Sequence, residues 1–336
     1  MRAASIKDVA NHAGVAVGTV SNVLNYPDRV APQTRERVLS SISDLGFVRN
    51  DAARQLRAGR SRTIGLIVLD IGNPFFSSLS RAAEDAAATG GRAVVLGNSG
   101  HDAQRESHYL DLFEEQQVQG VLISPVANVS ERLRALTARG TKVVLVDSRA
   151  DDGGFSSVSV DDVQGGHLAT RHLLELGRRK IAFIAGPQSL RQVRDRLEGA
   201  RQAVGEFPDA TLEVLDAAEM SVLAGRTVGD LLVERGLAEL PDGVFCANDL
   251  LALGLMQSLT MLHTLRIPED VALVGYDDID FAASAIVPLT SIRQPAALIG
   301  QTAIELLLEQ LESEATVPRS VVFKPELVVR GSTSGK

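Results

Sequence analysis

The chain has 336 residues, 45% of them hydrophobic, and a formal net charge of −8 at pH 7. This length suits two or three domains with large cores, and a single cysteine excludes an intrachain disulfide framework. The first residues lead straight into a polar segment without an apolar signal region, and no uncharged stretch is long enough to cross a bilayer. We therefore expect a cytoplasmic protein without a membrane segment.

The charge is unevenly distributed along the chain. Residues 1–62 contain ten Lys and Arg against five Asp and Glu, a net charge of +5, whereas the remainder has a net charge of −13. A basic end is typical of nucleic-acid binding, and an acidic bulk resists non-specific adhesion to DNA.

The first 25 residues have the pattern of two short helices joined by a glycine turn. Ser5 with Asp8 is a capping-box pair at the start of the first helix, and Gly14 ends that helix. In the second helix, residues 17–25, apolar side chains form one stripe and small or amide side chains form the other face. Such a face suits entry into a DNA groove. Taken alone, the pattern also fits a helical hairpin inside a larger core.

A third helix follows from Pro32, and a short basic segment lies beyond it at residues 50–59. Asn50 is a candidate N-cap of this segment and Gly59 a candidate stop, but an isolated helix of this length is marginal in water. Leu56 lies among Arg54 and Arg57, as an apolar wedge for the minor groove requires. The alternative is a solvated linker.

From Thr63 onward, short apolar runs alternate with helical segments. Continuous runs rich in Val, Ile and Leu indicate strands buried on both faces, hence parallel sheets covered by helices. The predicted strands are 64–69, 93–96, 120–123, 142–146, 180–184, 244–246 and 271–275, and the clearest helices are 75–88, 105–117, 163–176 and 250–261. A second start near Lys180 predicts two doubly wound subdomains with a ligand cleft between them.

Polar groups follow the predicted strand ends. Asp70, Asp147, Asn248 and the Tyr276-Asp277-Asp278 run each come after a strand, and the segment after Gly186 contains Arg191, Arg194 and Arg196. Carboxylates that accept hydroxyl hydrogens, together with guanidiniums that donate in a planar fork, suit a polyhydroxylated ligand such as a sugar.

The sequence offers little support for catalysis, a cofactor or a metal. Neither Gly-x-Gly-x-x-Gly nor Gly-x-x-x-x-Gly-Lys-Ser/Thr follows a strand. The Gly97–Gly100 run is one residue short of a nucleophile elbow, and we expect His101 beside it to be solvated. His167 and His172 are five residues apart and fall off one helical face, and Cys246 lies in an apolar run typical of a buried strand. We expect no enzyme activity, no cofactor and no metal.

These motifs together resemble the lactose-repressor/galactose-repressor (LacI/GalR) family of bacterial transcription factors. The resemblance covers essentially the whole chain and rests on the opening helix-turn-helix, the 50–59 segment, Asn73-Pro-Phe-Phe76, Asn248-Asp249 and Gly275-Tyr-Asp-Asp278. It implies an all-α helix-turn-helix headpiece plus an α/β core of two doubly wound parallel-sheet subdomains of the periplasmic-binding-protein type. The expected domains are the headpiece at 1–48, a hinge helix at 49–60, a core N-subdomain at 61–160 and 292–322, and a core C-subdomain at 161–291 and 323–336.

The family also implies the function: a dimeric repressor that binds operator DNA and is switched by a small effector. It further implies which residues of this chain contact DNA and effector. Those facing DNA bases would be Val17, Gly18 and Asn22, and those bonding DNA phosphates Ser5, Thr19, Ser21 and Asn25. The minor-groove hinge would use Leu56, Arg54 and Arg57. The effector would contact Phe75, Phe76, Asp147, Gln192, Arg196, Met220, Asn248 and Asp277, and residues 291–293 and 321–324 would cross between the subdomains.

Several positions depart from the family's pattern. Ala16 leaves the second helix without a side-chain N-cap, Gly18 offers no side chain, and Asn22 favours reading adenine. Leu190 and Gln192 favour a sugar over a purine as the effector. The alternative effector is a nucleobase or a sugar phosphate that acts as a corepressor. No leucine heptad follows the last strand, so we expect a homodimer. A periplasmic sugar-binding protein would need an export signal and would lack residues 5–59.

Overall fold

The computed structural model describes residues 4–47, 61–127, 130–150, 153–313 and 317–334. The chain divides into two compact units, residues 1–61 and residues 62–336, and each is described by itself. The predicted hinge residues Arg54, Leu56 and Arg57 lie outside the described residues.

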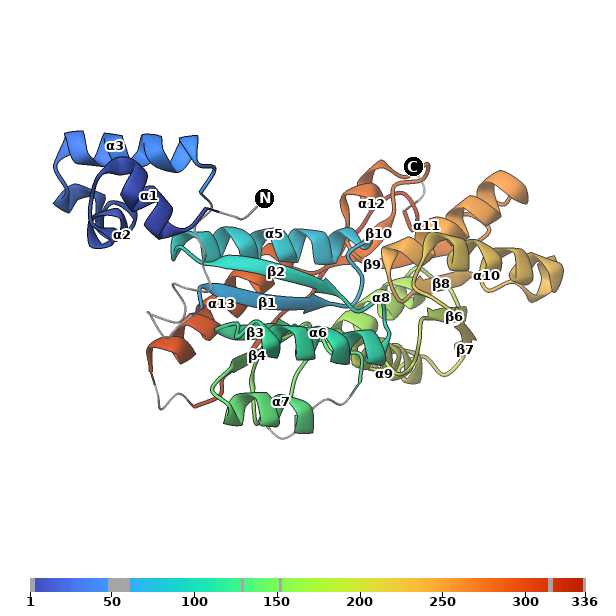
Figure 1. The fold of residues 1–336 in the computed structure, drawn as a ribbon. Helices are drawn as coiled ribbons and strands as arrows, with labels where there is room; N and C mark the ends of the chain where they lie inside the picture. The colour runs from blue at the N-terminus through green and yellow to red at the C-terminus, as the bar shows by residue number, and fades with distance from the viewer. Residues whose placement is uncertain (1–3, 48–60, 128–129, 151–152, 314–316, 335–336) are drawn as a thin grey trace. The chain divides into compact units, whose positions relative to one another are not determined.

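The N-terminal unit is a small helical bundle (Figure 1). Its helices are α1 (Ile6–Ala13), α2 (Val17–Asn25), η1 (Pro27–Arg29) and α3 (Pro32–Asp44). Val9 of α1, Val20 of α2 and Val38 of α3 are fully buried and form the centre of its apolar core. These side chains hold the helix-turn-helix together, so the opposite face of α2 is left open to solvent.

Local interactions explain where α1 begins and ends. The Ser5 hydroxyl accepts a hydrogen bond from the Asp8 amide at 3.3 Å, and the Asp8 carboxylate accepts one from the Ser5 amide at 2.8 Å, which is the predicted capping box. Gly14 closes the helix at φ +62°, a conformation that costs glycine least. Ala16 at the start of α2 makes no side-chain capping bond, as the sequence predicts.

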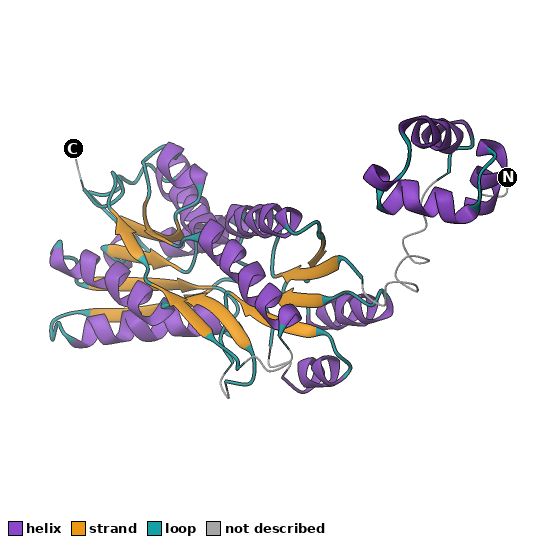
Figure 2. Cartoon of the chain, turned by 90° about the vertical axis from the view of Figure 1, so that its left-hand side faces the viewer, coloured by secondary structure: helices purple, strands orange, loops and turns teal. Residues whose placement is uncertain are grey.

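The core unit contains two six-stranded sheets with helices on their faces (Figure 2). The N-subdomain sheet has the order β11-β5-β4-β3-β1-β2 and consists of β1 (Thr63–Val68), β2 (Ala93–Asn98), β3 (Gly120–Ile123), β4 (Lys142–Val146), β5 (Ser156–Val160) and β11 (Ser320–Phe323). The C-subdomain sheet has the order β12-β10-β9-β8-β6-β7 and consists of β6 (Lys180–Ala185), β7 (Thr211–Asp216), β8 (Gly243–Cys246), β9 (Ala272–Asp277), β10 (Thr290–Arg293) and β12 (Glu326–Val328). Among the described strands, every neighbouring pair is parallel except β10 with β12. This confirms the predicted fold class.

Each helix of the core unit belongs to one of the two subdomains, including α8 and α13, whose flanking strands belong to different sheets. On the N-subdomain they are α5 (Pro74–Thr89), α6 (Ala103–Glu115), α7 (Ser130–Ala138) and α13 (Ala296–Glu312). On the C-subdomain they are α8 (Asp162–Glu175), α9 (Arg191–Gly205), α10 (Val222–Glu234), η2 (Leu237–Glu239), α11 (Asp249–Gln257), η3 (Ser258–Leu262) and α12 (Asp280–Ser284). The predicted helix 250–261 is α-helical only as far as Gln257, where α11 ends. The chain continues directly into the π-helical turn η3.

The chain passes between the two sheets three times: after β5, after β10 and after β11. The segments expected to be the crossings, 291–293 and 321–324, are for the most part strands themselves, and the crossings follow them. Three closely spaced connections allow one sheet to rotate against the other while both stay folded.

Helices α8 and α9 approach each other at glycines. A Cβ on Gly199 would lie 1.9 Å from the Val163 carbonyl oxygen and 2.6 Å from the His167 amide nitrogen, both backbone atoms. Gly199→Ala should therefore lower the free energy of unfolding by about 2–3 kcal/mol. Gly205 ends the same helix with open space around it, so Gly205→Ala should stabilise by up to about 1 kcal/mol. Urea unfolding of both variants checks this, and an equal response would contradict the close approach.

Candidate functional site

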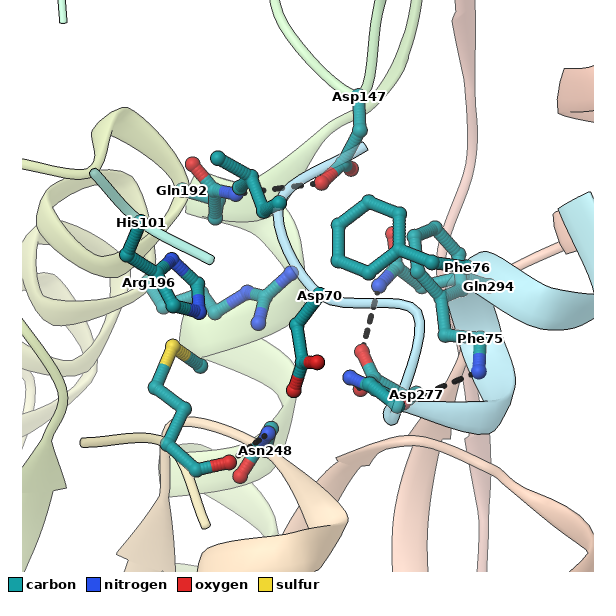
Figure 3. A pocket seen from close by; sticks show the side chains of 13 residues that line it. Asp70, Phe75, Phe76, His101, Asp147, Gln192, Arg196, Asn248, Asp277 and Gln294 are labelled. Carbon is teal, nitrogen blue, oxygen red and sulfur yellow. Dashed lines mark hydrogen bonds between the residues drawn. The ribbon is translucent and has the colours of Figure 1, made fainter. Parts of the chain in front are cut away.

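A pocket lies between the two subdomains at the carboxyl ends of strands from both sheets (Figure 3). We call it the cleft pocket. All eight residues assigned to effector binding from the sequence line it: Phe75, Phe76, Asp147, Gln192, Arg196, Met220, Asn248 and Asp277. Its other lining residues are Leu69, Asp70, Asn73, His101 and Gln294.

Hydrogen bonds join the two sides of the cleft pocket. The Asn73 side-chain amide, at the start of α5, donates to the Asp277 carboxylate at the end of β9, at 2.9 Å. The Gln192 amide on α9 donates to the Asp147 carboxylate after β4, at 3.2 Å. Each bond pairs one residue of the N-subdomain with one of the C-subdomain. The bonds therefore depend on how the two subdomains are rotated.

Arg196 occupies the floor of the pocket and is almost fully buried. Its Nε donates to the Asp162 carboxylate at 2.8 Å, and its Nη1 donates to the Ala247 carbonyl oxygen at 2.7 Å. The guanidinium lies over the ring of Tyr276, 3.7 Å from the centroid. Burial alone lowers the pKa of Arg196, but the coulombic effect of Asp162 and the other nearby groups outweighs it and keeps the group charged.

Carboxylates are in excess in this region. Asp147, Asp162 and Asp277 are all buried near the single guanidinium of Arg196. Burial raises the pKa of each carboxyl, and at Asp147 the neighbouring Asp162 raises the pKa further. A ligand that donates hydrogen bonds relieves this excess, whereas an anionic ligand adds to it.

Three acceptor atoms of the pocket residues have no hydrogen-bond partner within the described chain. They are Nδ1 of His101, Oδ1 of Asp147 and Oε1 of Gln294, and all three are buried. The amide oxygen can only accept, the Asp147 oxygen accepts when the carboxyl is ionised, and His101 Nδ1 accepts when the proton is on Nε2. Because buried polar groups without partners are costly, these atoms point to a ligand with several donor hydrogens.

Three pocket residues have left-handed backbones that non-glycine residues rarely adopt. They are His101 at φ +61°, Asp147 at φ +53° and Asp277 at φ +110°. Such conformations cost free energy and concentrate at functional sites. They occur just after β2, just after β4 and at the last residue of β9, where the side chains line the cleft pocket.

Aromatic rings form one wall of the pocket, and its free volume is small. The rings of Phe75 and Phe76 pack edge to face with centroids 5.0 Å apart, and the side chain of Asn73 caps their helix by accepting from the Phe75 amide at 3.0 Å. The free volume is about 20 Å³, room for about one water molecule. A ligand larger than a water molecule therefore needs the pocket to widen.

Sequence reasoning missed His101 as a pocket residue. The expectation that it is solvated is wrong, because it is half-buried and lines the pocket after β2. Burial lowers the pKa of its imidazole against the opposing effects of Asp70 and Glu219, so the ring is neutral at pH 7. A position after a predicted strand is the one signal that could have included it.

Asn248 has two functions. Its side-chain oxygen accepts from the Leu251 amide at 2.9 Å and so caps α11, and its amide donates to the Met220 carbonyl oxygen at 3.2 Å. These bonds fix the side chain at the pocket wall, so its orientation does not depend on a ligand.

On the headpiece, the residues assigned to DNA contact lie on and around α2. Gly18 and Asn22 are exposed, and Val17 is half-buried. Asn25 donates from its amide to the Ser21 carbonyl oxygen at 2.8 Å, while Ser5 caps α1. Thr19 and Ser21 are partly exposed. The exposed face of α2 thus presents small and amide groups.

The described residues contain no group of three His, Cys, Asp or Glu side chains that could hold a metal ion. Cys246 is fully buried in β8, and burial raises the pKa of its thiol, which disfavours the reactive thiolate. Among the described helices, none is both long and apolar enough to cross a membrane.

Comparisons with known proteins agree with this architecture. Residues 5–50 match the family described as bacterial regulatory proteins, lacI family, and residues 170–333 match the periplasmic binding protein-like domain. The chain is 33% identical to the HTH-type transcriptional repressor PurR of Aliivibrio fischeri over 99% of each chain. It is 35% identical to the HTH-type transcriptional regulator RegA of Clostridium saccharobutylicum, over 98% of this chain and 99% of the other.

Solved structures of transcriptional regulators are also similar to this chain. A lac repressor dimer bound to operator and the anti-inducer ONPF is 28% identical, with a TM-score of 0.83 over 99% of each chain. The transcriptional regulator CelR in complex with cellobiose is 32% identical, with a TM-score of 0.72 over 98% of this chain and 99% of the other. A LacI family regulator from Enterococcus faecium with bound ribose is 30% identical, with a TM-score of 0.74 over 82% of this chain and 99% of the other.

Proposed function

Because the chain belongs to the lacI family of bacterial regulatory proteins, we propose that it is a cytoplasmic repressor that binds a palindromic operator as a homodimer and is switched by a neutral sugar in the cleft pocket. Its relatives are DNA-binding transcriptional regulators, which are not enzymes. The family supplies the general function. The residues of this chain support the narrower assignments that follow.

The proposed DNA-reading surface is the exposed face of α2. Asn22 is exposed and has the amide that pairs with adenine in the major groove, while Val17 and Gly18 allow close approach to the base edges. Phosphate contacts fall to Ser5, Thr19, Ser21 and Asn25. With one amide as the main base reader, we infer that half-site spacing and central-step shape contribute much of the discrimination.

The proposed hinge is the segment 49–60, which lies outside the described residues. Its sequence places Leu56 among Arg54 and Arg57. In the proposed mechanism, two such segments pair in one state of the core and insert Leu56 into the minor groove.

Exposed apolar side chains support a dimer of the core unit. They lie on β2, near the start of α10, and on and just after α12: Val95, Leu96, Leu223, Phe281 and Ile286. These elements lie in the upper part of the core unit in Figure 1. Exposed apolar side chains are typical of a protein interface where they form a continuous patch. An interface that includes both subdomains would change when they rotate, and so could relay effector binding to the headpieces.

The unpartnered acceptors of His101, Asp147 and Gln294 are the observation that carries the effector class. Hydroxyl groups supply donors to all three, and the Phe75 and Phe76 rings give an apolar wall for a sugar ring. The excess of buried carboxylates disfavours a phosphate in this pocket. The bound cellobiose and ribose named for two related structures agree with a sugar.

A ligand screen with an operator readout tests this function. We expect one of a panel of neutral pentoses, hexoses and disaccharides to raise the thermal midpoint of the full-length protein and to change its affinity for operator DNA at least tenfold. Free nucleobases and sugar phosphates serve as the competing classes. A nucleobase that met both criteria while every sugar failed would refute the sugar assignment and leave the operator-binding assignment intact.

A further inference from the structure

A second cavity lies in the same cleft and is much larger than the cleft pocket, with a volume of about 290 Å³ against about 20 Å³. We call it the arginine cavity. Arg191 and Arg194 face it from α9, whereas Gln192 and Arg196 of that helix face the cleft pocket. Its volume is near the lower end of the range for small-molecule sites, which begins at about 300 Å³.

Both subdomains contribute to the arginine cavity. The N-subdomain supplies the turns after β3 and β4, with Val126, Ser148 and Arg149, and the C-subdomain supplies Ser189 and the first turn of α9. Arg191 donates from Nη1 to the Arg149 carbonyl oxygen at 3.3 Å, which joins the two sides. A ligand held here would contact both subdomains at once.

The charge of the cavity lining differs in sign from that of the cleft pocket. Arg149, Arg191 and Arg194 line it, and no Asp or Glu is among its described lining residues. Asp195, which does not line the cavity, pairs with Arg149 at 3.5 Å and with Arg191 at 3.4 Å, and Arg194 donates to the carbonyl oxygens of Gln188 and Ser189 at 2.9 and 2.8 Å. Guanidiniums positioned in this way suit bidentate binding of a phosphate.

Helix α9 adds to the preference for an anion. It begins at Arg191 and runs for 15 residues, and its N-cap residue Leu190 makes no side-chain capping bond. Its positive end therefore lies beside the arginines. The remaining wall is apolar, formed by Leu145, Phe155 and their neighbours, with serine hydroxyls at the rim. This combination suits a phosphate attached to a small organic body.

We propose that the arginine cavity is a second ligand site, which binds a phosphorylated small metabolite through residues that do not line the cleft pocket. The phosphate lies between Arg149 and Arg194, so it joins the N-subdomain to the C-subdomain. Because Arg149 belongs to the N-subdomain and Arg194 to the C-subdomain, binding there favours the arrangement in which both line one cavity.

Calorimetric titration of the full-length protein tests the proposal. The probes are glucose 6-phosphate, ribose 5-phosphate and inorganic phosphate, with glucose and ribose as neutral controls at equal ionic strength. We expect at least one phosphorylated sugar to bind, and Arg149→Gln combined with Arg194→Gln to weaken that binding at least tenfold. Arg201→Gln is the matched control, because Arg201 is exposed on the same helix and does not line the cavity.

Asp277→Asn separates the two sites, because Asp277 lines only the cleft pocket. Phosphorylated-sugar binding that survives Asp277→Asn but not the double arginine substitution supports the second site. Loss of binding on Asp277→Asn, unchanged binding in the double arginine variant, or no binding of any phosphorylated sugar would each overturn it. If thermal unfolding shows that the double variant is not folded, the single variant Arg149→Gln tests the proposal instead. We expect it to lower the affinity for the phosphorylated sugar at least fivefold.

Discussion

Arg196→Ala is expected to abolish the response of operator binding to the effector and to lower the free energy of unfolding by about 3–5 kcal/mol. The substitution leaves the buried Asp162 carboxylate without its 2.8 Å partner and the Ala247 carbonyl oxygen without its donor. It also removes the guanidinium that lines the cleft pocket. Effector titrations of operator binding and urea unfolding measure the two effects.

A second variant separates ligand recognition from stability. Arg196→Met combined with Asp162→Asn replaces the buried pair by neutral side chains, so most of the lost unfolding free energy should return. The effector response should remain absent, because the donor in the pocket is still missing. A double variant that is stable and responds to effector normally would show that Arg196 stabilises the fold and has no part in effector recognition.

Asn22→Ala is expected to weaken operator binding by about 2–6 kcal/mol for a dimer, at least 30-fold, since each amide–adenine pair contributes about 1–3 kcal/mol. Asn22 is exposed on α2 and its side chain packs in no core, so thermal unfolding should be unchanged. Fluorescence anisotropy with labelled operator measures the affinity.

The salt dependence of that binding identifies the type of contact. Loss of a base contact leaves the slope of log affinity against log salt unchanged, whereas loss of a phosphate contact lowers it. Asn11→Ala is the matched control, because Asn11 is an exposed amide on α1 and not on α2. Equal affinities for Asn22→Ala, Asn11→Ala and the unmodified protein would remove Asn22 from the base-reading surface.

Much of the core could be predicted because its strands are buried on both faces. Strands β1, β4, β6 and β9 are continuous apolar runs, and each was predicted within two residues of its bounds. Strand β5 is not among the predicted strands, because Ser156-Ser-Val-Ser-Val160 contains three serines and is not a continuous apolar run. Its serines are nevertheless buried, and Ser157 donates to Ser320 of the neighbouring β11 at 3.0 Å. That pairing joins residues 163 positions apart, which no local pattern reveals.

The same limit applies to the pocket. Asp147 comes directly after one predicted strand and Asp277 two residues after another, so their convergence could be expected from the geometry of parallel sheets. Gln294 follows β10, a segment interpreted as a crossing, and His101 follows β2 in a polar turn. Both reach the pocket through backbone paths that depend on the whole fold. Phe75 and Phe76 were assigned by family resemblance, because their aromatic side chains alone would also suit a core.

The small free volume of the cleft pocket limits the rate at which an effector can bind. With room for about one water molecule, a sugar can bind only after the Asn73–Asp277 and Gln192–Asp147 bonds have separated. Loading of the effector then has a ceiling rate, set by how often the subdomains part and independent of further increases in sugar concentration. In the proposed function, a brief rise in the sugar would therefore load fewer repressors than a sustained rise of the same size.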